Sequence, residues 1–238
     1  MIFCILCFDF FSILKLRSNK RMNEFIKKQE YNYIKRCMGD LNSGLRNCVD
    51  KNVVDAIRIC CQDKILSHFN DLSDEQKKVL DISNITDPLL IEPYLKELNQ
   101  YVYGMPKLSS AEVIKVFKKE KKLKLPNLNI EESKLVYLGW IDESTRKLLI
   151  TYKLDGKLFG MACRLPKTSN KGTNICALCN HIDSESEVAF VSPICKQTSE
   201  DDYKSLGFYV CLDSNECNER IESVEKLEEL IKTVNRIK

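Results

Sequence analysis

The chain has 238 residues, of which 44% are apolar and 30% are charged, and its formal net charge is +3. This length allows one large domain or two small ones, with enough apolar residues for a buried core. The nearly balanced charge excludes a uniformly basic nucleic-acid-binding chain, so any electrostatic partner must be sought in local patches.

Residues 1–21 begin with an apolar run that is too short to span a bilayer and that contains Asp9. Basic residues follow this run instead of preceding it, and no small-residue cleavage site is seen, which does not fit a signal peptide. We therefore expect translation to begin at Met22, with residues 1–21 a non-native or disordered extension. A short membrane anchor and an additional helix are the alternatives.

The chain contains 12 cysteines but no recognisable export signal. Disulfides persist mainly in oxidising compartments. We therefore expect a cytoplasmic protein whose cysteines either bind metal or pack as small apolar residues.

Residues 22–104 are predicted to form a small bundle of four helices. Apolar residues recur at three- and four-residue steps from Ile34 to Cys48, which is the period of one helix face. Asn52 is a candidate N-cap for the second helix.

The starts of the third and fourth helices have local signals. Ser73 and Gln76 form a capping box that begins the third helix. Pro88 after Asp87 fits the first turn of the fourth helix, and Pro93 is expected to delay or kink it.

Gly104 and Pro106 break this pattern, so we expect a boundary there and a second domain over residues 107–238. Ser109 and Glu112 form another capping box, and the helix that they open is predicted to place four lysines on one face. These lysines are Lys115, Lys118, Lys119 and Lys122. The face of Lys115–Lys124 is either a solvated surface or a contact for an acidic partner or a phosphate backbone.

The second domain next shows strand patterns. Segments 135–141, 147–152 and 157–163 predict a meander that packs against the basic helix, with Asp155-Gly156 as a two-residue hairpin turn. Segments 188–191 and 208–210 predict a second hairpin. One continuous helix is expected from about Asn215 onward, supported by the pairs Glu222–Lys226 and Glu228–Lys232.

Two cysteine pairs bracket the second hairpin, in the pattern C-x2-C followed by C-x5-C. They are Cys176, Cys179, Cys211 and Cys217. Four thiolates at such spacings predict one closed structural zinc site without an open position for water. Four free or redox-active thiols are the alternative, and Cys195 and His181 are possible substitute ligands.

A knuckle, a hairpin and then a helix that carries a ligand in its first turn is the layout of a treble-clef zinc finger. The expected fold class is therefore α+β. A small N-terminal helical bundle precedes an α/β domain with a β-meander, and a four-Cys treble-clef zinc finger occupies about residues 174–238.

Motifs for common enzyme classes are missing from the sequence. It contains no phosphate-binding glycine loop, dinucleotide fingerprint, nucleophile elbow or HExxH motif, and only two histidines. We therefore expect a non-enzymatic protein. An enzyme that needs turnover, such as one with thiol redox chemistry, is the alternative.

Six segments together carry a family resemblance. They are 31–34, 115–119, 124–126, 138–140, Cys176-x-x-Cys179-Asn180 and Gly207-x-Tyr209-x-Cys211-x5-Cys217-Asn218. In this order they resemble the FusB-type fusidic-acid-resistance proteins, which bind elongation factor G, and they cover the chain from about residue 29 to its end.

The resemblance implies that the zinc-bearing domain binds elongation factor G and promotes its release from ribosomes on which fusidic acid has trapped it. This is target protection without drug modification. It implies a monomer with no small-molecule substrate, no stable membrane association and only indirect contact with the ribosome. The alternative function is a zinc-finger module that binds RNA or the ribosome through the Lys115–Lys124 face.

The resemblance also implies contact residues. In the family these are an aromatic residue before the first zinc cysteine, a lysine and a tyrosine before the third, and an aromatic residue in the last helix. The tyrosine is Tyr209, and the other positions hold Ile175, Leu206 and Leu230, with Lys204 near enough to replace the lysine. The substitutions keep apolar character at Ile175 and Leu230 but lose ring area.

Overall fold

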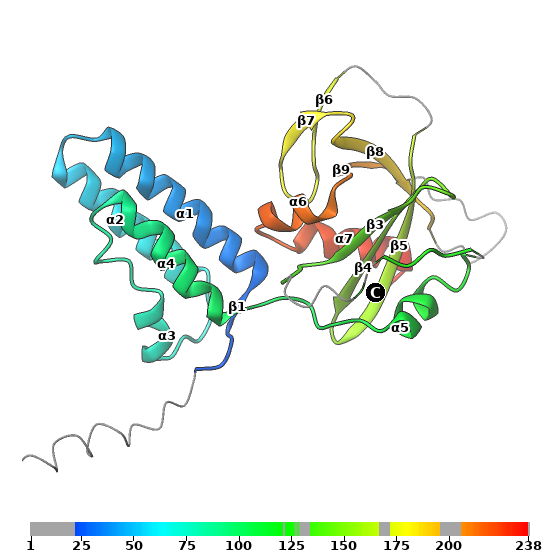
Figure 1. Ribbon diagram of the computed structural model, residues 1–238, viewed down its shortest axis with the longest axis horizontal. Helices are drawn as coiled ribbons and strands as arrows, with labels where there is room; N and C mark the ends of the chain where they lie inside the picture. The colour runs from blue at the N-terminus through cyan, green and yellow to red at the C-terminus, as the bar shows by residue number, and fades with distance from the viewer. Residues whose placement is uncertain are drawn as a thin grey trace, which may run out of the picture.

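The computed structural model describes residues 22–120, 122–126, 128, 134–166, 172–195 and 206–237. They form an N-terminal helical unit and a C-terminal α+β unit that lie side by side (Figure 1). The expectations for residues 1–21 and for Lys204 fall outside this set. Among the described helices, none combines the length and the hydropathy that a bilayer crossing requires.

The four predicted N-terminal helices are present. They are α1 (Lys28–Asn47), α2 (Lys51–Ser67), α3 (Asp74–Val79) and α4 (Ile91–Leu98), with short 3-10 helices η2 (Pro88–Leu90) and η3 (Asn99–Tyr101) on either side of α4. Ser73 and Gln76 form the predicted capping box. The N-cap of α2, however, is Asp50, whose carboxylate accepts a hydrogen bond from Asn52 N, so the predicted N-cap, Asn52, lies two residues too late.

The helices bury the predicted apolar stripe of α1, in which Ile34, Cys37, Met38 and Leu41 are each 0% exposed. Two short parallel strands, β1 (Ile26–Lys27) and β2 (Val102–Tyr103), pair at the two ends of the unit. Neither strand was predicted, because a two-residue strand has no detectable alternation.

The C-terminal unit is built on one curled antiparallel sheet of order β3-β4-β5-β8-β9. Its strands are β3 (Leu138–Asp142), β4 (Lys147–Leu154), β5 (Lys157–Arg164), β8 (Val188–Pro193) and β9 (Phe208–Cys211). A separate hairpin contains β6 (Thr173–Ile175) and β7 (Ile182–Ser184). The predicted meander and its tight turn are confirmed, with φ of 47° at Asp155 and 77° at Gly156 as a type I′ turn requires.

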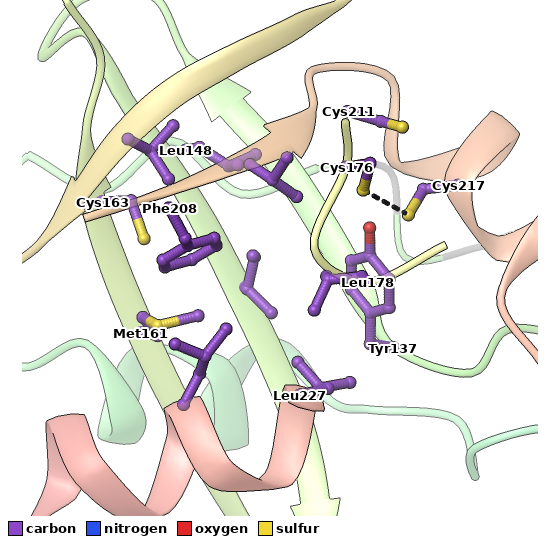
Figure 2. Close-up of a cluster of buried hydrophobic side chains, with 14 of the residues drawn as sticks. Tyr137, Leu148, Met161, Cys163, Cys176, Leu178, Phe208, Cys211, Cys217 and Leu227 are labelled. Atoms are coloured by element: carbon purple, nitrogen blue, oxygen red, sulfur yellow. Dashed lines mark hydrogen bonds between the residues drawn. The ribbon is translucent and has the colours of Figure 1, made fainter. Parts of the chain in front are cut away.

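The alternation of β4 divides the core into two layers. Leu148 and Ile150 belong to the cluster that α7 (Glu225–Asn235) covers, whereas Leu149 belongs to the cluster around Val113 of α5 (Ser110–Val116). The sheet therefore lies between α7 and α5 (Figure 1). The apolar cluster on the side that faces α7 also contains Cys176, Cys211 and Cys217 (Figure 2).

Helix α5 begins with the predicted capping box of Ser109 and Glu112 but ends at Val116. The prediction that Lys115, Lys118, Lys119 and Lys122 share one helix face is therefore wrong. Phe117 turns into the core, where its ring meets Trp140 edge-on at 5.5 Å, and like charges at three- and four-residue steps disfavour further helix. The proposed RNA-binding face loses its geometric basis.

The predicted continuous C-terminal helix is also wrong, because the structure has two helices. Helix α6 (Ser214–Arg220) ends at Ile221, whose backbone is extended, and α7 starts after Val224. The predicted pair of Glu222 with Lys226 is therefore not formed, and Glu222 pairs with Arg36 at 2.7 Å. The second predicted pair, Glu228 and Lys232, is present at 3.9 Å.

One face of α1 docks on α6 and the break that follows it. The Asn32 side-chain amide is buried and donates to the backbone oxygens of Asn218 and Ile221, both at 2.8 Å. Lys28 and Lys35 pair with Glu219 at 2.6 and 3.0 Å. Polar contacts at successive turns of α1 thus fix the helical unit against the second unit.

Glu219→Gln is expected to loosen this docking at neutral pH. Burial acts to raise the pKa of Glu219, but Lys28 and Lys35 outweigh it and hold the pKa below its ordinary value. Because the pKa of Glu219 is lowered in the docked state, the ionised carboxylate stabilises docking at pH values above the ordinary carboxyl pKa. This stabilisation is lost as the pH falls through the lowered pKa. The protection factor of the Ile221 amide, measured by hydrogen–deuterium exchange and corrected for the intrinsic pH dependence, should be smaller in the variant at pH 7. It should also lose the decrease that the wild type shows on acidification.

The matched control is Glu229→Gln, which removes a carboxylate that pairs with Lys226 on the surface of α7. It should exchange like the wild type at Ile221. Wild-type exchange in Glu219→Gln would show that the lysine–carboxylate cluster does not hold the two units together.

Candidate functional site

The four predicted zinc ligands come together from three elements. Cys176 and Cys179 lie in the knuckle between β6 and β7, Cys211 ends β9, and Cys217 lies in α6. Their sulfur atoms all lie within 4.8 Å of one another. Two opposite edges of the cluster are short, with Sγ–Sγ distances of 3.9 Å for Cys176–Cys217 and 3.6 Å for Cys179–Cys211.

Local backbone bonds shape the knuckle. Cys176 N donates to His181 O at 2.8 Å, and Asn180 N donates to Cys176 O at 2.9 Å. Asn180 has a φ of 59°, a left-handed conformation that asparagine tolerates better than most residues. Ala177 N donates to Tyr209 O at 2.8 Å, which ties the knuckle to β9.

This arrangement fits a zinc ion. A tetrahedral site with zinc–sulfur bonds of about 2.3 Å has sulfur–sulfur edges of about 3.8 Å, close to the two short edges seen here. Four cysteines leave no open position, so the ion would be structural. Cys195 and His181 do not substitute for any ligand: Cys195 Sγ faces Pro193 O, and His181 Nε2 faces Asp183 at 3.2 Å.

The four sulfurs compete for negative charge when no cation lies between them. Hydrogen bonding with Cys176 lowers the pKa of Cys179, whereas the same neighbour raises the pKa of Cys217, because a second negative sulfur beside the first is unfavourable. Arg220 Nη2 lies 3.9 Å from Cys211 Sγ and brings positive charge to the cluster. A bound cation would remove the conflict between the sulfurs and let all four ionise.

Buried groups from the segment before β3 and from α6 support the cluster. Asn218, 1% exposed, accepts from Val136 N and Tyr137 N at 2.6 and 3.1 Å and donates to Tyr137 O at 3.0 Å and to Ser214 O at 2.7 Å. Figure 2 shows the Tyr137 ring beneath the cysteines, with its hydroxyl pointing toward Cys176 and Cys217. Burial, followed by Cys217, raises the pKa of Tyr137 well above its ordinary value.

The expected partner contacts fall in different environments. Ile175 is 56% exposed on β6, and Tyr209 is half-buried on β9. Leu206 is half-buried before β9. Leu230 is 2% exposed and packs in the core under the sheet, so it is not part of the surface.

Two exposed residues that the sequence reading missed lie directly opposite the expected ones. Ile182, 58% exposed, is the cross-strand partner of Ile175, and Phe190, 41% exposed, is the cross-strand partner of Tyr209. The Phe190 and Tyr209 rings meet at 5.3 Å. Segment 188–191 is apolar throughout, so no alternation marks Phe190 as outward-facing, and β7 is too short to show a pattern. We call Ile175, Ile182, Phe190 and Tyr209 the hairpin patch.

Comparison with known proteins adds a second line of support. Residues 25–106 match the family described as "Elongation factor G-binding protein, N-terminal", and residues 111–236 match "FBP C-terminal treble-clef zinc-finger". No curated protein matches the chain.

A solved structure entitled "Structure of the fusidic acid resistance protein FusC" is similar over both units. The TM-score is 0.66 with 27% sequence identity, and the alignment covers 89% of this chain and 98% of the FusC chain. Since the zinc-finger match alone spans more than half of the chain and its four cysteines converge as a zinc site requires, the protein contains one structural zinc and belongs to the elongation factor G-binding proteins with an FBP treble-clef zinc finger.

Proposed function

We propose that this protein binds elongation factor G through the hairpin patch, releases the factor from the ribosome and so protects it from fusidic acid. The observation that carries the proposal is a set of two apolar cross-strand pairs beside the zinc cluster, in which three side chains are exposed and that of Tyr209 is half-buried. One pair is Ile175 with Ile182, and the other is Phe190 with Tyr209. Exposed apolar groups that gather on a rigid support are typical of protein interfaces.

The zinc cluster has a positioning role in this proposal. Ile175 directly precedes the ligand Cys176, and the knuckle hydrogen-bonds to Tyr209 O through Ala177 N. The metal therefore fixes the two hairpins relative to each other, and an interface gains affinity when its contact residues are already in place before binding. This is a binding function that needs no turnover.

Ile182 and Phe190 supply apolar contact area that replaces the aromatic rings missing from the family's contact positions. The aromatic residue expected before Cys176 is Ile175 here, and the one expected in the last helix is the buried Leu230. Phe190 supplies a ring next to Tyr209, and it is held there because it packs over Gly207, where any side chain would collide with the ring. Leu206 and Lys204 flank the patch in sequence and are proposed as contacts at its border.

Tyr209→Ala is expected to weaken binding to purified elongation factor G by about 30-fold, which corresponds to about 2 kcal/mol for a buried aromatic contact. Calorimetric titration of the full chain measures this effect. Phe190→Ala should weaken binding in the same direction, since its ring abuts that of Tyr209. Zinc content should remain at the wild-type level in both variants.

Ile59→Ala serves as the control, because Ile59 is 62% exposed on α2, far from the zinc unit in sequence and fold. It should bind like the wild type. Absence of wild-type binding at micromolar concentration would remove the proposal. Release is tested separately with ribosomes that hold the factor and fusidic acid: the protein should accelerate dissociation while the mass of the drug stays unchanged.

A further inference from the structure

Two hydroxyl groups beside Cys217 are buried without a partner. Tyr137 is 0% exposed and Ser214 is 6% exposed, and neither hydroxyl oxygen has a hydrogen-bond partner at ordinary distance in the described part of the chain. Buried hydroxyls nearly always find a partner, so a pair of unbonded ones at one place points to an interaction that forms when the site is complete. The zinc cluster is the polar group next to them (Figure 2).

The backbone brings the hydroxyls to this place by specific contacts. The Asn218 side chain accepts from Tyr137 N and donates to Tyr137 O. These two bonds fix the backbone of Tyr137 just before β3 and so the position of its ring. Ser214 lies over Gly139, and a side chain at Gly139 would occupy the position of the Ser214 hydroxyl. The glycine of the Leu138-Gly139-Trp140 motif therefore allows α6 to approach β3 closely enough for Ser214 to reach Tyr137.

The chemistry of the groups sets the direction of the bonds. A closed four-thiolate zinc site carries a net negative charge, and its sulfurs accept hydrogen bonds. We propose that the Tyr137 hydroxyl donates to the zinc-bound Cys217 sulfur and accepts from the Ser214 hydroxyl, forming a relay that retains the metal. Each hydroxyl then has a partner, and β3 is joined to the zinc site by a side chain as well as by Asn218.

This role goes beyond partner binding, since it concerns how tightly the chain keeps its zinc. Groups that hydrogen-bond to metal ligands typically change metal affinity by about 10- to 100-fold when removed. Tyr137→Phe keeps the ring and its packing but deletes the donor. We therefore expect its zinc affinity, measured on the full chain by competition with a chromogenic chelator, to fall by about 10- to 100-fold.

Tyr94→Phe is the matched control. Its hydroxyl is also buried and has no partner among the described residues, but Tyr94 packs in the N-terminal unit. Loss of that hydroxyl should leave zinc affinity unchanged. A general effect of removing a buried tyrosine hydroxyl would act on both variants, whereas the proposed bond affects only Tyr137→Phe.

Cobalt supplies a readout that packing alone would not change. In the Co²⁺-loaded full chain, a hydrogen bond to a thiolate lowers the energy of its electrons, so its loss in Tyr137→Phe should shift the sulfur-to-cobalt charge-transfer band to longer wavelength. Ser214→Ala should give a smaller shift and a smaller loss of zinc affinity. If Tyr137→Phe does not fold, Ser214→Ala still tests the relay. An unchanged band and wild-type zinc affinity in the variants that fold would overturn the proposal.

Discussion

Cys176→Ser is expected to abolish zinc retention and to unfold the zinc unit. Cys176 is 0% exposed and supplies one of four sulfurs, so the variant leaves three thiols around a position that a serine hydroxyl fills poorly. Structural zinc contributes about 10–16 kcal/mol in small zinc modules, which equals or exceeds the whole stability of an ordinary domain. The loss should therefore be decisive for the C-terminal unit.

Metal analysis and far-UV circular dichroism check this expectation. Zinc should drop from one equivalent to near zero, and limited proteolysis should cut the region from β6 to α7 while α1 and α2 survive. Cys195→Ser is the matched control, because Cys195 lies in the same unit but outside the cluster. It should keep full zinc. Helicity lost throughout the chain would show that the N-terminal unit cannot persist without its neighbour.

Asn218→Ala is expected to destabilise the protein by about 3 kcal/mol or more. The side-chain oxygen of Asn218 accepts from two backbone N–H groups, those of Val136 and Tyr137, and its nitrogen donates to two carbonyls. Each buried group left without a partner costs about 1–3 kcal/mol. No other side chain in the described residues bonds to these two N–H groups.

Urea unfolding followed by the fluorescence of Trp140, the single tryptophan of the chain, measures the change close to the affected contacts. Asn235→Ala is a milder comparison, because Asn235 only donates, to Gly160 O and Ile231 O, and its loss leaves no N–H unpaired. Asn218→Asp should also destabilise, since it sets a carboxylate oxygen against the carbonyls of Tyr137 and Ser214. Wild-type stability in Asn218→Ala would mean that water replaces the lost bonds.

Features that depend on neighbouring residues could be predicted from the sequence. The capping boxes at Ser73 and Ser109, the type I′ turn at Asp155 and the two cysteine pairs are all short-range patterns with a direct physical cause. They were sufficient to identify the fold class and the zinc ligands, because each pattern has few alternative structures.

Features that depend on distant residues could not be predicted in this way. The break after α6 leaves Ile221 O facing Asn32, which is 189 positions away in the chain. The end of α5 depends on Phe117 finding Trp140 on a strand formed later in the sequence. Leucine is more often buried than exposed. The family resemblance nevertheless placed Leu230 among the partner contacts, and the packing of α7 on the sheet shows that it is buried.

The amide of Asn32 gives the two units an unusual dependence on each other. The last carbonyls of α6, like those of any helix, have no partner within the helix, and the bonds from Asn32 to Asn218 O and Ile221 O act as a cap supplied by the other unit. A chimera that joins this zinc unit to the helical unit of a relative should therefore fold well only when the relative offers an amide side chain at the same turn of its first helix. For this protein, exchange of the helical unit would therefore depend on one capping position.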